Sequence, residues 1–412
     1  MDYTELDEFL GNKKQGEVVV SSNEYFSDIP LPETWETLDE FIKWYMDARM
    51  PLMVPWNSST SSTENTTTMS IFRKFPYLVE MCMVHPGHSI PEHTHPGTEI
   101  QIMLLGGGEN FAEDPNGLCK VSQAWGEFKQ PIINDQYFKL GDINKTNKGL
   151  SFLIFSKWPE GWLEKYNNFG AGTLTQWQGN TSGSMHEKYI KDAVQGSVAE
   201  NGYADIHGNE KAEVLNVVDL DTTPLKSKLS SSDYFKDLVI PDDWIDLEDF
   251  ASWWIKNKMP ILVPWNAEVI ISDDATAICV FRKGQYQVEF YVEHPFYSIG
   301  SHCHPGMEVL TLYLAGGKNN PPGPRTFHNT ADQWGRIRSK LKSGLYHGGE
   351  NTTVTSGFVL IAIQKWVKDI EVSSAAINWK GNTAGPKQDA LIKRHKPNAF
   401  TRTGYADVSL TN

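Results

Sequence analysis

Two closely similar stretches decide how this chain is read: His93–Glu99 (HTHPGTE) and His302–Glu308 (HCHPGME). In each, two histidines stand two residues apart and therefore share one face of a strand. A Pro-Gly turn separates them from a glutamate, and a further histidine, His347, follows later in the second stretch's half of the chain. If the strands pair antiparallel, these imidazole and carboxylate groups can converge on a divalent metal ion.

The rest of the chain repeats in the same way. Met50–Asn57 (MPLMVPWN) returns as Met259–Asn266 (MPILVPWN), and each half closes on Gly-Asn-Thr followed by Gly-Tyr-Ala-Asp. The length of 412 residues also exceeds the roughly 250–300 at which a single hydrophobic core stops growing. We therefore predict two tandem domains, residues 1–208 and 209–412.

Each half is expected to open with one helix and to continue in strands. A capping pattern begins at Thr37, apolar residues follow at helical spacing, and Pro51 ends the helix; Asp246 and Pro260 do the same in the second half. The aromatic faces of these helices fit either packing on the domain's own sheet or a partner-binding stripe. Beyond them, short β-branched and aromatic runs such as Tyr286–Glu293 alternate with turn residues. This pattern predicts an all-β sandwich or barrel in each half.

Composition excludes several classes of protein. Lys and Arg number 37 against 51 Asp and Glu, so the chain lacks the cationic excess that nucleic acids and anionic membrane surfaces require. No apolar run approaches the roughly 20 residues of a membrane span, and residues 1–17 show no signal-peptide pattern. The 4 cysteines have no CxxC spacing. We expect a cytoplasmic protein that binds neither nucleic acid nor membrane.

The two motifs resemble those of the cupin superfamily. The residues that carry the likeness are Gly87, His93, His95, Glu99 and Gly106 in the first half, and His302, His304, Glu308, Gly316, Gly344, His347 and Asn351 in the second. The second half departs from the pattern at Phe296, in place of the leading glycine, and at Lys342, in place of a proline. The resemblance implies a small jelly-roll β-barrel in each half, a bicupin overall.

The resemblance also implies a set of metal ligands. In the second half the ligand positions are His302, His304, Glu308 and His347. The first half keeps His93, His95 and Glu99 as a second, incomplete metal site, because Phe138 stands where the third imidazole would be. That site is either occupied through its remaining ligands or vestigial. The alternative for the second half is that its histidines only form hydrogen bonds inside the barrel.

Alternation along the strand predicts the surroundings of the second site. Leu310 and Leu312 share the face of Glu308, so we expect a largely apolar cavity that suits an uncharged, planar or hydrophobic ligand. Arg282 faces either solvent or this cavity, where it could clamp an anionic group. Tyr346, beside the third histidine, is a further candidate for contact with substrate.

Two functions of different classes follow. The first is a mononuclear metal-dependent dioxygenase acting on a small organic substrate, with Fe(II) as the first metal and Mn, Ni or Zn also open. By resemblance, Glu308 would also serve there as a proton acceptor. The second is a non-catalytic jelly-roll protein of the storage, carbohydrate-binding or virion type, in which a metal joins two sheets. Association into a homo-oligomer is open under either function.

Overall fold

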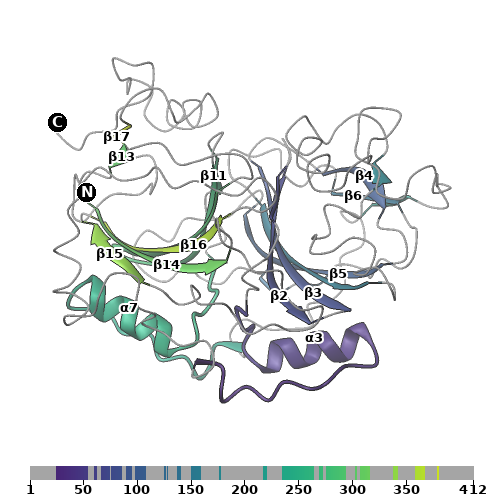
Figure 1. Ribbon diagram of the computed structural model, residues 1–412, viewed down its shortest axis with the longest axis horizontal. Coiled ribbons are helices and arrows are strands. Elements are labelled where there is room, and N and C mark those ends of the chain that lie inside the picture. The colour runs from purple at the N-terminus through teal and green to yellow at the C-terminus, as the bar shows by residue number, and fades with distance from the viewer. Residues whose placement is uncertain are drawn as a thin grey trace.

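The computed structural model describes part of the chain in two similar halves. The described residues are 25–53, 60–62, 66–74, 76–85, 90–94, 98–107, 125–126, 128, 137–140, 150–158, 176–177, 217–219, 234–263, 269–271, 275–293, 302–303, 307–315, 337–341, 358–366 and 378–379. Figure 1 shows the halves side by side, each with a curved sheet and one helix beneath it. None of the helices among these residues is long and apolar enough to cross a membrane.

The first half contains helix α3 (Leu38–Asp47) and two sheets. The larger sheet has the order β1-β2-β3-β7-β5, with β1 at Thr60–Ser62, β2 at Thr66–Lys74, β3 at Tyr77–Val84, β7 at Leu150–Lys157 and β5 at Glu99–Gly107. The smaller sheet has the order β8-β4-β6-β9, with β8 at Gln176–Trp177, β4 at Ile90–Thr94, β6 at Tyr137–Leu140 and β9 at Val217–Asp219. All these neighbours are antiparallel except β6 and β9.

The second half repeats this plan with helix α7 (Leu247–Lys256). Its larger sheet has the order β10-β11-β12-β16-β14-β15, with β10 at Val269–Ile271, β11 at Ala275–Lys283, β12 at Tyr286–Glu293, β16 at Phe358–Lys365, β14 at Glu308–Ala315 and β15 at Ile337–Leu341. Opposite it, β13 (His302–Cys303) pairs with β17 (Asn378–Trp379). The predicted fold class, two similar halves dominated by β-strands with an added helix each, is confirmed.

Side-chain caps explain where the two helices begin. The Thr37 hydroxyl accepts a hydrogen bond from the backbone N–H of Glu40 (3.2 Å), and the Asp246 carboxylate accepts one from the N–H of Asp249 (2.9 Å). Such caps satisfy backbone donors that the first helical turn leaves without an acceptor. Both caps were predicted from the sequence, and both helices end before the prolines that follow them.

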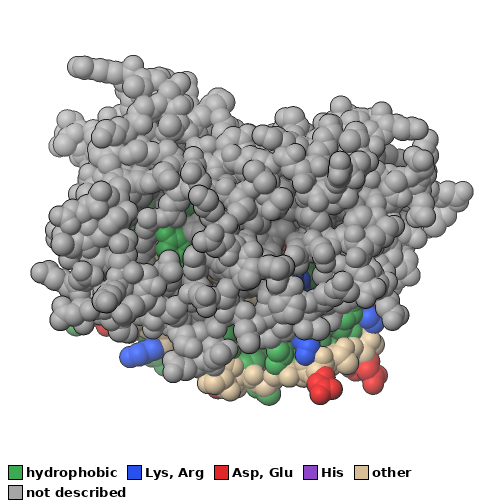
Figure 2. Space-filling model, viewed as in Figure 1, with side chains coloured by type: hydrophobic (Ala, Val, Ile, Leu, Met, Phe, Trp, Pro, Cys, Tyr) green, Lys and Arg blue, Asp and Glu red, His purple; other side chains and the backbone are tan. Residues whose placement is uncertain are grey.

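The aromatic face of each helix packs on its own large sheet. The rings of Phe41 in α3 and Tyr77 in β3 lie 4.9 Å apart, and those of Phe250 in α7 and Tyr286 in β12 lie 5.0 Å apart. Both phenylalanines are completely buried. Of the two uses foreseen for these faces, packing on the sheet is therefore the observed one. Figure 2 shows charged side chains along the lower edge of the molecule, where the helices lie in Figure 1.

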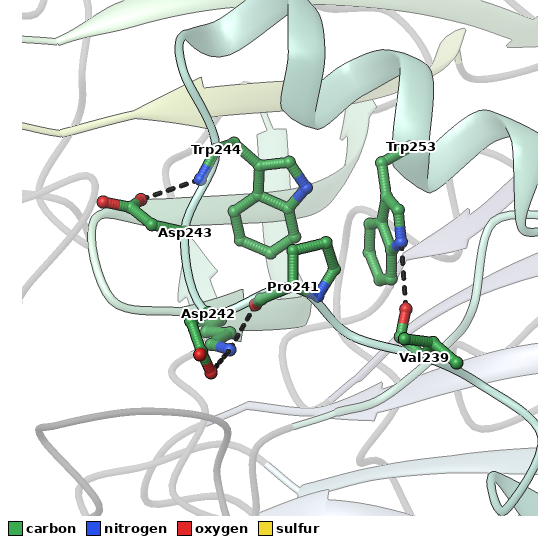
Figure 3. Close-up of polar contacts among 7 residues, drawn as sticks. Val239, Pro241, Asp242, Asp243, Trp244 and Trp253 are labelled. Atoms are coloured by element: carbon green, nitrogen blue, oxygen red, sulfur yellow. Dashed lines mark hydrogen bonds and ion pairs between the residues drawn. The ribbon is translucent and has the colours of Figure 1, made fainter.

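The segment entering α7 is held by tryptophan and lysine side chains. The indole N–H of Trp253 donates to the carbonyl of Val239 (3.1 Å), and the ammonium group of Lys283 donates to the carbonyl of Pro241. The ring of Trp244 lies 5.2 Å from that of Trp253. Figure 3 shows both indole rings around Pro241. These contacts fix the direction in which the chain enters the helix.

The two halves hold each other through equivalent residues. Arg49 lies 5.0 Å from the ring of Tyr234 and donates to its carbonyl; Lys258 lies 4.4 Å from the ring of Tyr25 and donates to its carbonyl. Each cation also forms an ion pair with an aspartate three residues after that tyrosine, at 3.2 and 3.0 Å. Because each half supplies the same groups to the other, the contact has the reciprocal form of a symmetric dimer interface.

The backbone at these cations has an uncommon conformation. Four residues after the helices have positive φ angles, namely Arg49 (63°), Met50 (48°), Lys258 (62°) and Met259 (51°). A left-handed conformation costs a residue with a side chain roughly 1–2 kcal/mol. The same turn occurs in both halves and ends the helix just where the cation contacts the other half. We infer that the contacts between the halves stabilise the turn.

Buried polar groups lie between the halves as well. The hydroxyls of the equivalent residues Thr67 and Thr276 are 2.9 Å apart, and the Thr67 hydroxyl is 3.0 Å from Nε2 of His85. One continuous hydrophobic cluster includes residues of both halves. Within it, burial raises the pKa of Tyr45 and of Tyr234. The halves therefore share a buried interface.

Strand β9 pairs across the predicted boundary between the two domains. Its residues, Val217–Asp219, belong by sequence to the predicted second domain, residues 209–412. The strand nevertheless pairs in parallel with β6 of the first half, where Phe138 is opposite Val218. The boundary at residue 208 stays a prediction, and the segment shortly after it completes the smaller sheet of the first half.

We predict that removing both cations between the halves destabilises the chain. The double variant Arg49→Ala, Lys258→Ala should lower the free energy of unfolding by about 2 kcal/mol, since each cation loses a cation–π contact and an ion pair. Urea unfolding followed by tryptophan fluorescence measures this. The control is Lys43→Ala, which removes an exposed pair with Asp47 within α3 and should change stability by less than about 0.5 kcal/mol. Equal effects of the two variants would contradict the reciprocal interface.

Candidate metal and ligand site

The first histidine of each motif lies in the smaller sheet, on the side of the large sheet away from the helix (Figure 1). In β4, His93 pairs with Phe138 of β6 on one side and with Trp177 of β8 on the other. In β13, His302 pairs with Trp379 of β17. Each half thus sets its first motif histidine opposite a tryptophan near the end of that half.

The pairing of β4 with β6 in the first half shows which residue lies opposite His93, where a third imidazole would be expected. Directly opposed residues on antiparallel strands have their Cβ atoms about 4.5–5.5 Å apart and face the same side. In this register, Phe138 is the residue directly opposite His93. In the alignment of the halves, the counterpart of Phe138 is His347.

Several predicted site residues lie outside the described residues. They are His95, His304, Tyr346 and His347. Within the part of the chain that the structure describes, no three His, Cys, Asp or Glu side chains gather closely enough to hold a metal ion. The convergence of the second-half ligands stays a prediction.

The structure puts Glu308 on the helix side of the large sheet. In the ladder, Glu308 of β14 is opposite Lys365 of β16, which is opposite Tyr286 of β12. Residues in one such row share a face, and the Tyr286 ring packs against Phe250 of α7. Glu99 has the same place in the first half. Both glutamates, each the first residue of its strand, thus stand on the face of the large sheet that is covered by the helix.

Leu310 and Leu312 follow Glu308 on this helix-covered face. They are opposite Ile363 and Ile361, which are opposite Val288 and Phe290. The prediction that the two leucines share the face of Glu308 is confirmed, but the face is the one that packs toward α7. This orientation does not support the expected apolar substrate cavity lined by these leucines, which stays a prediction. Alternation alone could not tell which face lies inside.

The other face, toward β13 and β17, carries polar side chains. In β11, Phe281 packs against Trp253 of α7, with ring centroids 5.6 Å apart, so the next residue, Arg282, takes the interior face. Arg282 is opposite Gln287, which is opposite Gln364. We call Arg282, Gln287 and Gln364 the donor row. The ladder puts Arg282 on the face of the sheet toward β13 and β17, and its predicted contact with a substrate stays a prediction.

A buried carboxylate orients the donor row. Glu289 is 2% exposed and accepts hydrogen bonds from the amide nitrogens of Gln287 (2.6 Å) and Gln364 (2.7 Å). The amide oxygen of Gln364 accepts from the indole N–H of Trp366 (3.0 Å). Since amide oxygen and nitrogen are assigned from their partners, this network fixes which way both amides point. Sequence reasoning missed Gln287, Glu289 and Gln364.

The first half has a different interior. Arg73 and Glu80 are 4% and 1% exposed, in the places of Arg282 and Glu289. Burial lowers the pKa of Arg73 to about 10, and the charge of Glu80 acts in the opposite direction. The neighbours of Arg73 in its row are Leu78 and Ser156, where the second half has two glutamines. The donor row therefore belongs to the second half only.

No family model and no curated protein matches this chain. Among solved structures, oxalate decarboxylase from Bacillus subtilis matches with 11% identity over 78% of each chain. Coconut cocosin matches with 9% identity over 81% of this chain and 88% of its own, and the pumpkin pro-11S globulin with 9% over 80% and 89%. The TM-score is 0.20 in all three cases. At this TM-score the likeness carries no argument, and the fold is described by the two similar β-rich halves themselves. These proteins include a decarboxylase and a globulin, and the likeness indicates no activity for this chain.

We predict that the buried charges of the first half depend on each other. Glu80→Gln should lower the free energy of unfolding by about 3 kcal/mol, because it leaves the Arg73 guanidinium buried without its counter-charge. The double variant Arg73→Met, Glu80→Leu should be much less destabilised, since both charges are gone. Chemical unfolding of the three proteins measures this. A double variant as unstable as Glu80→Gln would contradict the coupling.

Proposed function

We propose that the second half binds a divalent metal ion through the imidazoles of His302, His304 and His347, and that the chain is a metal-dependent oxygenase. The observation that supports this is the pairing of His93 with Phe138 in the first half. By the repeat, the residue beside His302 on the next strand would be His347. Two imidazoles within about 5 Å of each other on one face, with a third two residues along, fit metal–nitrogen bonds of about 2.1 Å.

The donor set fits a mononuclear centre with open positions. Three neutral nitrogens suit Fe(II), our first candidate, and also Mn, Ni or Zn. When bound, such an ion can bring a substrate and dioxygen together and neutralise developing negative charge. The residues of the chain would hold the ion and orient the substrate beside it. In the first half Phe138 replaces the third imidazole, so we propose one metal ion per chain.

Glu308 is the least supported member of the predicted ligand set. The motif assigns it the carboxylate position, whereas its row with Lys365 and Tyr286 puts it on the helix side of the sheet. If it binds the metal, the start of β14 must turn so that its carboxylate reaches the interior face. Glu308→Gln therefore tests the motif assignment separately from the imidazoles.

One observation favours the second class of function. The two halves share one core and a reciprocal interface, as expected of a chain built for rigidity. In a storage or assembly protein, the metal would join the two sheets, and removing it would unfold the second half. In an oxygenase, the metal-free chain stays folded and regains the ion. A cytoplasmic location, a small-molecule substrate and a homo-oligomer stay predictions for both.

We predict close to one metal ion per chain in protein purified without added metal. His347→Ala should bring the content below about 0.1 per chain, because two imidazoles alone bind weakly. His395→Ala, a histidine outside both motifs, is the control and should keep the wild-type content. Elemental analysis measures the metal, and thermal unfolding verifies that each variant is folded. Wild-type protein that contains no metal would contradict the proposal.

The same measurement separates the two classes of function. Chelation should leave the circular dichroism spectrum unchanged under the oxygenase proposal, and added Fe(II) should restore the metal content. Loss of folded structure on chelation would instead support a structural ion.

A third imidazole in the first half should create a second centre. Phe138→His places a histidine opposite His93, so metal content should rise toward two ions per chain. Phe138→Leu is the control for the change in size and should leave the content at the wild-type value. An unchanged content in Phe138→His would count against the proposed equivalence of residue 138 and His347.

A further inference from the structure

We infer that one water molecule is bound in the core between the two halves, held by the hydroxyls of Tyr45 and Tyr234 and by the indole N–H of Trp125. We call these three residues the interface cluster. The inference goes beyond the proposed function, because it does not depend on whether the second half binds a metal ion.

Each member of the interface cluster buries a polar atom that lacks a partner. Tyr45, Trp125 and Tyr234 are 0%, 2% and 6% exposed. Neither phenol oxygen, nor the indole nitrogen, forms a hydrogen bond within the part of the chain that the structure describes. Buried polar groups in native proteins are almost always hydrogen-bonded, either to the protein or to ordered water. Three such groups in one cluster therefore indicate a further partner.

The three groups come from different parts of the chain and meet where the halves join. Tyr45 lies in α3, and Tyr234 lies in the segment that precedes α7. The rings of Trp125 and Tyr234 are 5.3 Å apart. Arg49, four residues after Tyr45, lies 5.0 Å from the ring of Tyr234 and so holds it beside the end of α3. Burial raises the pKa of Tyr45, and the charge of Tyr234 raises it further, so the two phenols are close enough to interact.

A water molecule fits these groups better than an ion does. Water has two hydrogens and two lone pairs, so it can accept from the Trp125 N–H and bond to both phenols, each of which can donate or accept. Buried waters typically make about three such bonds. An anion would instead bring an uncompensated charge into the apolar core, because the cation beside Tyr234, Arg49, is already paired with Asp237 at 3.2 Å.

The second half shows how the equivalent position is satisfied without water. In the repeat, Trp254 takes the place of Tyr45, and both side chains are completely buried. The indole N–H of Trp254 donates directly to the carbonyl of Pro260 (3.2 Å). In the first half the side chain is smaller, and its hydroxyl has no such partner among the described residues. The phenol thus leaves both a polar group to satisfy and side-chain volume to fill, which are the two conditions for a bound water.

Unfolding of phenylalanine variants tests the site in solution. Tyr45→Phe and Tyr234→Phe should each raise the unfolding equilibrium constant about fivefold, the loss expected for one hydrogen bond. Because both hydroxyls bond to the same water, the double variant should fall clearly short of the product of the two effects, about 25-fold. Tyr286→Phe is the matched control, since its hydroxyl donates directly to the carbonyl of Trp244 (2.9 Å), and its effect should multiply with that of Tyr45→Phe. A Tyr45→Phe protein as stable as wild type, or a double variant at the full product, would contradict the shared water.

A crystal structure of the full wild-type chain, at a resolution that shows single waters and from crystals soaked in bromide, identifies the occupant. We expect one peak of density within hydrogen-bonding distance of the Tyr45 and Tyr234 hydroxyls, without anomalous signal at the bromine absorption edge. A peak that carries this signal would show an anion. The absence of a peak, or a direct hydrogen bond between the two hydroxyls, would show a dry site. Each of these other results overturns the inference.

Discussion

The packing of one aromatic helix face on each large sheet is the constraint on which the rest of the structure depends. Phe41 against Tyr77, and Phe250 against Tyr286, seal one face of the sheet in each half. Since side chains alternate along a strand, fixing one face also fixes the other. Every second residue of β11, β12, β14 and β16 is thereby directed toward the smaller sheet that contains His302. The location of the helix thus decides which residues can take part in a site.

The two interiors have diverged from this common plan. The first half has a buried pair of charges, Arg73 and Glu80, surrounded largely by apolar residues, and it has Phe138 in place of an imidazole. The second half adds two glutamines beside the equivalent charges, where Glu289 and Trp366 orient them. Duplication followed by specialisation of one copy accounts for this pattern, with the first half supporting the second through the shared core. The reciprocal contacts of Arg49 and Lys258 also join the two halves.

Much of the fold could be predicted from the sequence because the repeat allows one half of the chain to be compared with the other. The capping residues Thr37 and Asp246 and the division into two similar halves follow from local chemistry and the shared offset. The interior of the second half could not be predicted, because a period of two is the same whichever face is buried. In β12, Gln287 and Glu289 alternate with Val288 and Phe290, a pattern that usually indicates a solvent-facing polar side. The position of Arg282 could have indicated which face is buried. Its neighbour Phe281 is aromatic, like the helix residues Phe250 and Trp253 against which Phe281 packs.

X-ray absorption spectroscopy of the purified chain at the edge of its bound metal tests the account most directly, because it counts the ligands around the ion. We predict a first shell of light atoms near 2.1 Å with the multiple-scattering signature of three imidazoles. A shell that contains sulfur, or fewer than two imidazoles, would contradict a centre built on His302, His304 and His347.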